Sequence, residues 1–219
     1  MSMAPGDGGG KRRYHSPGRA ERARRTRAAV LAAAHELFVA RGYAGTTIRA
    51  VATAAGVSVP TVEQAFGTKR GLLKHVVDVA RAGDDEPVAI LDRPPALAAA
   101  AAADAADFLA AATAEIAVVA ARVAAVQAVL ATAAAADPEI AALAREIDAQ
   151  RRVVAAWLVD GVRTRAGLRG ERERAVDAVW TLLDPVVHGR LTAGCGWSSG
   201  EFADWLADAL GRLLLPDRG

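Results

Sequence analysis

A four-residue joint between two short apolar patterns constrains this chain more than any other feature. The joint is Ala55-Gly56-Val57-Ser58, and the apolar residues on either side of it recur at helical spacing. Glycine tolerates the left-handed backbone at a helix end, and serine caps the start of a helix. The joint therefore predicts two helices that meet at a steep angle, so residues 24–82 are predicted to form a helix-turn-helix domain.

The rest of this segment indicates four short helices in all. Gly42 is expected to end the first helix, and Thr46-Thr47 offers hydroxyl caps for the second. Ser58 caps the third, with Pro60 in its first turn, where the missing N–H of proline costs little. Thr68 caps the fourth. Because the third helix projects outward, it has the shape that fits a DNA major groove.

Residues 27–76 contain a set of residues whose types and spacing form a distinctive pattern. They are Leu37-Phe38, Gly42-Tyr43, Thr46-Thr47, Ala55-Gly56-Val57-Ser58, Thr61, Phe66, Lys69 and Leu72-Leu73. This segment resembles the DNA-binding domain of the TetR family of bacterial transcriptional regulators. The resemblance implies an all-α fold, in which the helix-turn-helix domain is followed by a domain over residues 83–219 for ligand binding and dimerisation. It also implies a homodimer on a palindromic operator, most often a repressor that a small-molecule effector releases from DNA.

One residue departs from the family pattern. Members of the family usually read Thr-x-Tyr-x-x-Phe here, with the tyrosine on a DNA phosphate, whereas this chain has Thr61-Val62-Glu63-Gln64-Ala65-Phe66. A carboxylate at that position repels phosphate and removes one positioning contact. Either Glu63 turns aside to pair with a nearby arginine, or it accepts a hydrogen bond from a cytosine amino group. The first interpretation is favoured, because the family position faces the DNA backbone.

The candidate DNA contacts follow from the resemblance and from side-chain chemistry. By resemblance, Thr47 and Lys69 hold phosphates. The tip of the third helix can make apolar contacts to thymine methyls or hydrogen bonds to base edges, whereas Arg49 can reach a base or a phosphate. These tip residues are Ser58, Val59, Pro60, Thr61 and Gln64. The alternative for each residue is ordinary helix surface.

The charge of the chain is divided between its two parts. Residues 1–75 hold 13 Lys and Arg against 4 Asp and Glu, and residues 76–219 hold 14 against 21. Eight of these Lys and Arg lie in residues 11–27, directly before the helices of the predicted helix-turn-helix. Residues 1–23 are therefore predicted to form a flexible basic arm on DNA, supported by Arg24 and Arg25. A solvated tail is the alternative.

The second part reads as further helices, with Ala136-Asp137-Pro138 as the start of one. Residues 171–191 are predicted as one helix kinked at Pro185. Ser198 and Glu201 form a capping box for the last helix. By resemblance, the two C-terminal helices form the dimer contact; the alternative is a monomer core.

Effector contacts are predicted only from polar and aromatic residues that interrupt apolar stripes. The candidates are Gln127, Gln150, Trp157, Trp180 and His188. Ordinary core packing or surface exposure is the competing interpretation for each. No metal-ligand cluster, cofactor motif or catalytic constellation is visible, so we predict neither metal nor cofactor, and no enzyme.

The remaining features indicate a cytoplasmic protein. A single cysteine, Cys195, excludes an internal disulfide, and no signal peptide is apparent. Residues 116–136 are mostly apolar, but Arg122 and Gln127 interrupt them and alanine dominates, so no membrane span is expected. The alternative function is a helical protein that binds or sequesters a small molecule and has weakened DNA affinity, as Glu63 suggests.

Overall fold

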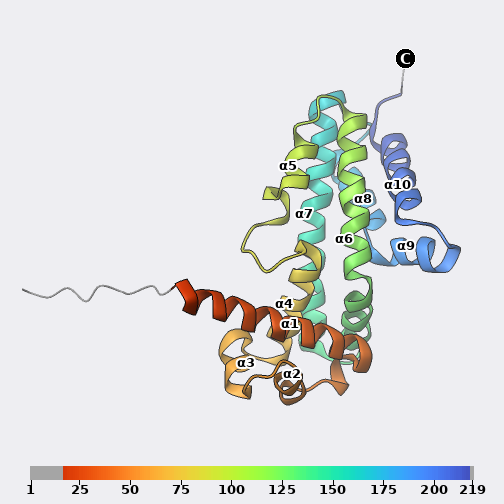
Figure 1. Ribbon diagram of the computed structural model, residues 1–219. Coiled ribbons are helices and arrows are strands. Elements are labelled where there is room, and N and C mark those ends of the chain that lie inside the picture. Colours follow the sequence, from red (N-terminus) through yellow and green to blue (C-terminus); the bar gives the residue numbers. More distant parts are fainter. Residues whose placement is uncertain (1–16, 218–219) are drawn as a thin grey trace, which may run out of the picture.

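The structure is a computed structural model that describes residues 17–217, and this part of the chain contains helices and no strands (Figure 1). The all-α fold class predicted from the sequence is confirmed. The α-helices are α1 (Pro17–Gly45), α2 (Ile48–Ala54), α3 (Val59–Phe66), α4 (Lys69–Ala82), α5 (Pro94–Ala100), α6 (Ala105–Ala134), α7 (Pro138–Ala166), α8 (Arg172–Leu182), α9 (Pro185–Gly189) and α10 (Ser199–Leu214). A 3-10 turn, η1 (Ile90–Asp92), and a π-helical turn, η2 (Arg190–Gly194), complete the described structure.

Helices α2, α3 and α4 begin at the predicted capping residues, whereas α1 begins earlier than predicted and continues past Gly42 to Gly45. Gly42 interrupts α1 with a φ of 69°, which glycine adopts without strain. The side-chain oxygens of Thr47, Ser58 and Thr68 each accept a hydrogen bond from a backbone N–H in the first turn of α2, α3 and α4. Capping therefore sets where each short helix begins.

The predicted flexible arm over residues 1–23 is wrong for residues 17–23, which form the first turns of α1. Residues 1–16 lie outside the described part of the chain. Neither glycine nor proline occurs from residue 19 to 41, and Glu21 pairs with Arg24 and Arg25, three and four residues later. Such spacing supports a helix, because side chains at those positions lie on one face.

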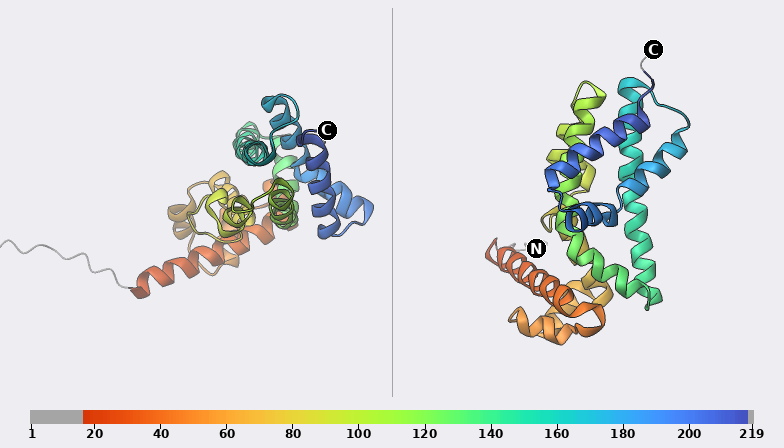
Figure 2. Two further views of the ribbon diagram at one scale, coloured as in Figure 1. Left: turned by 90° about the horizontal axis from the view of Figure 1, so that it is seen from above. Right: turned by 90° about the vertical axis from the view of Figure 1, so that its right-hand side faces the viewer.

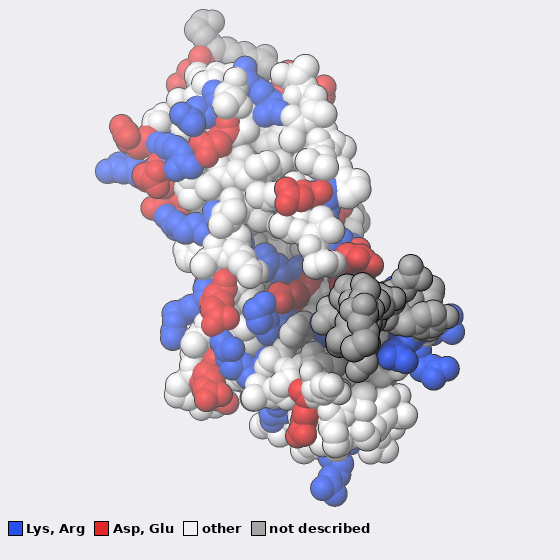
Figure 3. All heavy atoms as spheres, turned by 90° about the vertical axis from the view of Figure 1, so that its left-hand side faces the viewer, with Lys and Arg blue, Asp and Glu red and all other residues white. Residues whose placement is uncertain are grey.

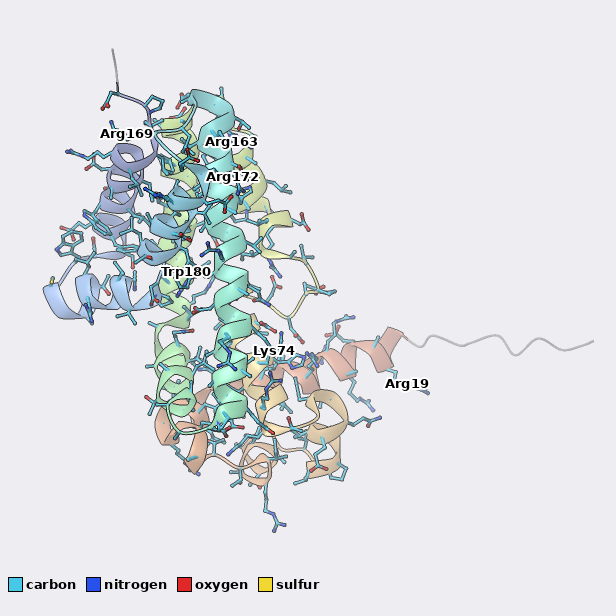
Figure 4. All side chains as sticks on the ribbon, turned by 180° about the vertical axis from the view of Figure 1, so that it is seen from behind. Arg19, Lys74, Arg163, Arg169, Arg172 and Trp180 are labelled. Carbon is cyan, nitrogen blue, oxygen red and sulfur yellow. The ribbon has the colours of Figure 1, made fainter. Side chains whose placement is uncertain are left out.

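A long antiparallel pair, α6 and α7, forms the centre of the rest of the molecule. Both helices run from the amino-terminal domain to the far end of the molecule (Figure 2, right). Helix α6 contacts α1, α4, α5, α7, α9 and α10. At the far end, Arg163 and Arg172 both pair with Asp160, and Figure 4 shows these arginines gathered where α7 gives way to α8. The Arg172 guanidinium holds the pKa of Asp160 below its usual range.

The apolar core does not divide at residue 83. One buried cluster combines residues of α1–α4 with Val126 and Leu130 of α6 and with Ile140, Leu143 and Ile147 of α7. A second cluster joins the other ends of α6 and α7 to α8 and α10, around residues such as Phe108 and Phe202. Helices α1–α4 and the rest of the molecule therefore share packed side chains.

The predicted kinked helix over residues 171–191 is two helices instead. Helix α8 ends at Leu182, and Pro185 is the first residue of α9, whose start is capped by the Asp184 side chain. Proline fits a first helical position better than a helix interior. The predicted capping box of Ser198 and Glu201 is present at α10.

Helix α6 is long and apolar enough to cross a membrane by length and composition alone, with a mean hydropathy of 1.9 in its most apolar window. This differs from the sequence interpretation, which gave more weight to the interrupting polar residues. A core helix of a globular protein can pass the same test. The contacts of α6 with six other helices place it at the centre of this fold.

The close approach of α6 and α7 depends on Gly161. A Cβ atom there would lie 2.3 Å from Cζ of Phe108, a buried ring that packs edge-on against Trp157. We expect Gly161→Ala to lower the free energy of unfolding by about 1–3 kcal/mol in urea denaturation, because the core would be overpacked. Gly189→Ala is the control: its Cβ would meet nothing within 4 Å, so about 0.5–1 kcal/mol of stabilisation is expected. Equal effects of the two substitutions would contradict this account.

Candidate nucleic-acid interface and ligand pocket

Helix α3 presents one face to solvent and buries the other. Val62 and Phe66 are buried in the core beneath the helix, whereas Pro60, Glu63 and Gln64 are exposed. The arrangement follows from the joint before α3, where Gly56 has a φ of 67° and the chain turns sharply. The outward face is about two helical turns long and carries both apolar and hydrogen-bonding groups.

The structure brings the predicted DNA contacts to the end of the molecule formed by α1–α4. Most of them are exposed: Arg24, Arg25, Thr47, Arg49, Ser58, Pro60 and Gln64. The others are half-buried: Val59, Thr61 and Lys69. The Ser58 and Thr61 hydroxyl oxygens lie 2.8 Å apart, so one O–H donates to the other hydroxyl and the second O–H stays available for a base edge.

The Lys69 ammonium is held in place before any ligand arrives. Its Nζ donates a hydrogen bond to the Tyr43 carbonyl oxygen at 3.0 Å and lies 4.1 Å from the centre of the Tyr43 ring. An ammonium has three donors, so this arrangement leaves donors for a phosphate. Lys69 is also the first residue of α4, and backbone N–H groups there add to the attraction for an anion.

A basic groove lies between α1 and α3. It has a volume of about 360 Å³, and its walls include Arg19, Arg22 and Arg27 of α1 and Thr61 and Gln64 of α3. Figure 4 shows Arg19 at the outer end of α1, and Figure 3 shows basic side chains on the lower part of the molecule, where α1–α4 lie. The sequence analysis singled out Arg24 and Arg25, which do not line this groove. Which arginines of α1 point toward α3 depends on how the helix is rotated about its axis, and the cluster of basic residues in the sequence does not show that rotation.

Arg27 joins three segments. Its guanidinium donates a hydrogen bond to the Ala65 carbonyl oxygen at 3.2 Å, lies 4.5 Å from the centre of the Phe66 ring, and pairs with Asp85 in the loop after α4. The loop is fixed in turn by Asp84, which accepts two hydrogen bonds from Arg93 at 2.7 and 2.9 Å. This pairing holds the pKa of Asp84 at about 2. The end of α3 is thereby tied to that loop.

Glu63 makes no ion pair with any residue between 17 and 217. The predicted pairing with a nearby arginine is therefore absent from the described structure. The side chain is exposed on the same face as Pro60 and Gln64. If α3 enters a groove, the carboxylate meets the DNA directly.

A pocket of about 120 Å³ lies between α6 and α7. Its remaining walls are formed by the end of α4, the turn η1, the start of α5 and the α8–α9 connection. Its lining is mainly apolar, and the polar or charged lining residues are Arg81, Glu115, Gln127, Asp148 and Arg151.

Only two of the predicted effector residues, Gln127 and Trp157, line this pocket. Gln150 lies in a neighbouring cleft, where its Oε1 accepts a hydrogen bond from Arg81 at 2.6 Å. Trp180 lies outside the pocket, with the Arg151 guanidinium 5.2 Å from its ring centre.

His188 is also outside the pocket. It is buried in the core, with its ring edge-on to Phe202 at 4.8 Å, and neither ring nitrogen has a hydrogen-bond partner within the described part of the chain. Apolar surroundings of this kind suit a neutral imidazole.

Sequence reasoning missed the four charged residues of the pocket. Arg81, Glu115, Asp148 and Arg151 lie on helices, where charge usually indicates a solvated face. Nothing in the local pattern shows that the last turn of α4 lies against the middle of α6 and α7. Within residues 17–217, no group of His, Cys, Asp and Glu has the arrangement of a metal site.

Comparisons with known proteins agree with this geometry. Residues 30–76 match the family model described as bacterial regulatory proteins, tetR family. The transcriptional regulator FadR of Bacillus subtilis, solved in complex with stearoyl-CoA, is 16% identical, with a TM-score of 0.66 over 84% of this chain and 97% of its own. A TetR-family regulator from Rhodococcus sp. is 17% identical, with a TM-score of 0.67 over 88% and 99% of the two chains.

A third similar structure is NalD of Pseudomonas aeruginosa, the secondary repressor of the MexAB-OprM multidrug efflux pump. It is 18% identical, with a TM-score of 0.64 over 91% of this chain and 100% of its own. A search of curated proteins found no match. At these identities the solved structures establish a shared fold, and the family model identifies the amino-terminal domain.

The helix-turn-helix of α2 and α3 lies within the residues that match the family model. Residues 30–76 are therefore similar to the DNA-binding domain of bacterial regulatory proteins of the tetR family, as the residues of this segment had indicated. Proteins of this family are DNA-binding regulators and not enzymes.

The burial of His188 predicts a pH dependence of stability. Burial lowers the pKa of the imidazole in the folded protein, so the unfolded chain binds a proton more readily. The contribution of His188 is fully present above its unfolded pKa of about 6.5 and is lost as the pH falls below that value. We expect the free energy of unfolding to fall between pH 7 and pH 5, and His188→Leu to reduce this decline in urea denaturation. His35→Gln, on α1, is the control and should retain the decline.

Proposed function

We propose that this protein is a ligand-responsive repressor that binds a palindromic operator as a homodimer in the cytoplasm. The observation that carries the proposal is the exposed face of α3, which lies beside a groove with three arginines in a domain of the TetR family. A projecting helix reads base edges, while flanking cations bind phosphates. The excess of positive charge in residues 1–75 favours DNA over other partners.

Dimerisation is proposed through the surface formed by α8, α9 and α10. These helices lie together along one side of α6 and α7 (Figure 1). Their partly exposed apolar side chains include Trp180, Trp205 and Leu213, and Val186 is 53% exposed. One recognition helix reads one half-site, so two copies of α3 about 34 Å apart are required for a palindrome.

The pocket between α6 and α7 is proposed as the effector site. Similar regulators bind small molecules, as the complex of FadR with stearoyl-CoA illustrates. Here α4 extends from Lys69 at the DNA-facing end to Arg81 in the pocket wall. A ligand that moves the end of α4 therefore acts on a helix packed against α1 and α3.

A second candidate function is a small-molecule-binding protein that has weakened DNA affinity. The observation that favours it is the exposed Glu63 on the face that would meet DNA, which has no ion-pair partner among residues 17–217. The held ammonium of Lys69 and the arginine groove favour the repressor.

Selection of bound duplexes from a random pool tests the proposed function. We expect an enriched palindrome whose half-sites are one helical turn apart, and failure to enrich any sequence would instead support the sequestering protein. Lys69→Ala should weaken binding to the enriched duplex and to unrelated duplexes alike, and it should reduce the slope of log affinity against log salt concentration by about 1. Gln64→Ala should relax preference at one base pair, and Arg145→Ala, exposed on α7, is the matched control.

The carboxylate of Glu63 is expected to oppose phosphate. Glu63→Gln removes the charge while keeping the size, so we expect binding to all duplexes to strengthen by about three- to tenfold in fluorescence anisotropy at low salt. The gain should shrink as salt is added. Loss of preference for a single C·G pair, with no general gain, would show instead that Glu63 reads a base.

A further inference from the structure

Most of the charge in the pocket wall is already compensated. The Asp148 carboxylate lies 2.9 Å from the Arg151 guanidinium, which also lies 3.1 Å from Asp184. Glu115 faces Arg122 across 3.6 Å. Each carboxylate that lines the pocket therefore has an arginine beside it.

Arg81 is the exception. It is half-buried, and it has no carboxylate within ion-pair distance in residues 17–217. Its Nη1 donates to the neutral amide oxygen of Gln150 at 2.6 Å. Burial lowers the pKa of the Arg81 guanidinium and Arg151 lowers it further, whereas Asp78 raises it. Partial burial removes part of the hydration of this guanidinium, and a neutral amide compensates for that loss less well than a carboxylate does.

A second cationic group in the same wall is incompletely satisfied. The side chain of Arg151 is 13% exposed, and its Nε atom is buried with no hydrogen-bond partner among the described residues. Among the described residues, Arg151 Nε thus lacks an acceptor and Arg81 lacks a carboxylate at ion-pair distance. Donors left over in a cavity wall favour an acceptor from outside.

Arg81 also lies where two cavities meet. It lines the inner pocket and a wider, open cleft of about 750 Å³, and the two share Ile90, Leu91 and Val154. A molecule that entered the inner pocket from the cleft would pass the guanidinium. The inner walls beyond it are apolar and include Ile116, Val119 and Trp157.

We propose that the pocket binds an amphipathic organic anion, with its carboxylate on Arg81 at the junction and its apolar chain or ring in the inner pocket. This inference rests on the proposed function, because it assigns the chemical class of the effector. A carboxylate matches the planar fork of a guanidinium and forms two charge-assisted hydrogen bonds. An apolar body fits the inner walls, where a polar group would lose its hydration without compensation.

A cationic ligand fits less well. It would have to displace an arginine from Asp148 or Glu115, and it would leave Arg81 with its neutral partner. A carboxylate supplies the charge that Arg81 lacks and breaks no existing ion pair. Because Arg81 lies in the last turn of α4, binding of the head group acts on the helix that begins at Lys69.

The test is isothermal titration of the full chain, without DNA, with three probes of equal chain length: octanoate, 1-octanol and octylammonium. Octanoate should bind about ten- to hundredfold more tightly than 1-octanol, because its carboxylate forms charge-assisted hydrogen bonds with Arg81 that a hydroxyl does not form. This ratio of dissociation constants corresponds to about 1.4–2.8 kcal/mol. Octylammonium should bind most weakly. Arg81→Gln should reduce octanoate to the affinity of 1-octanol and leave 1-octanol unchanged, whereas Arg81→Lys should keep part of the preference.

Arg145→Gln, exposed on α7, is the matched control and should change none of the three affinities. Circular dichroism checks that each variant is folded, and the three-probe series on the unaltered chain tests the preference without any variant. Tighter binding of octylammonium, no binding of any probe, or undiminished octanoate binding by folded Arg81→Gln overturns the proposal.

The titration contains no DNA, so its outcome is separate from that of the proposed function. A chain that binds octanoate through Arg81 but enriches no duplex would retain this inference and refute the repressor. An enriched palindrome together with no preference for octanoate would support the repressor and refute this inference.

Discussion

The shared apolar core between the two parts of the chain is the constraint on which the rest of the structure depends. Val126 and Leu130 of α6 and Ile140 and Leu143 of α7 are buried in the same cluster as Phe38, Leu72 and Val76 of the helix-turn-helix domain. Packed interiors respond to displacement as rigid bodies, because voids and overlaps are both costly. A change at the inner pocket therefore has a direct mechanical route to α1 and α4.

Arg27 adds a second, polar route to the same end. The loop that carries Asp84 and Asp85 forms part of the outer cleft, and Arg27 connects Asp85 to the last residues of α3. Occupation of the cleft and the orientation of the recognition helix thus involve one set of side chains. Two discrete arrangements of such contacts are the physical basis of a ligand-controlled switch.

Local chemistry was sufficient to predict much of the fold. Thr47, Ser58 and Thr68 cap the predicted helices because a side-chain oxygen beside an unpaired N–H acts over a few bonds. Prediction failed where distant contacts or helical phase decide the outcome. Residues 17–23 are helical rather than an arm, and the segment around Pro185 divides into two helices.

By itself, the sequence determined the helix-turn-helix, its caps, the family resemblance of residues 30–76 and the charge that suits DNA, because each depends on residues close together in the chain. Only the tertiary structure decided that the groove beside α3 is lined by Arg19, Arg22 and Arg27, and that Arg81 lines the pocket without a carboxylate of residues 17–217 at ion-pair distance. Whether a charge is paired depends on which helices pack together over long sequence separations. Local patterns do not encode that packing.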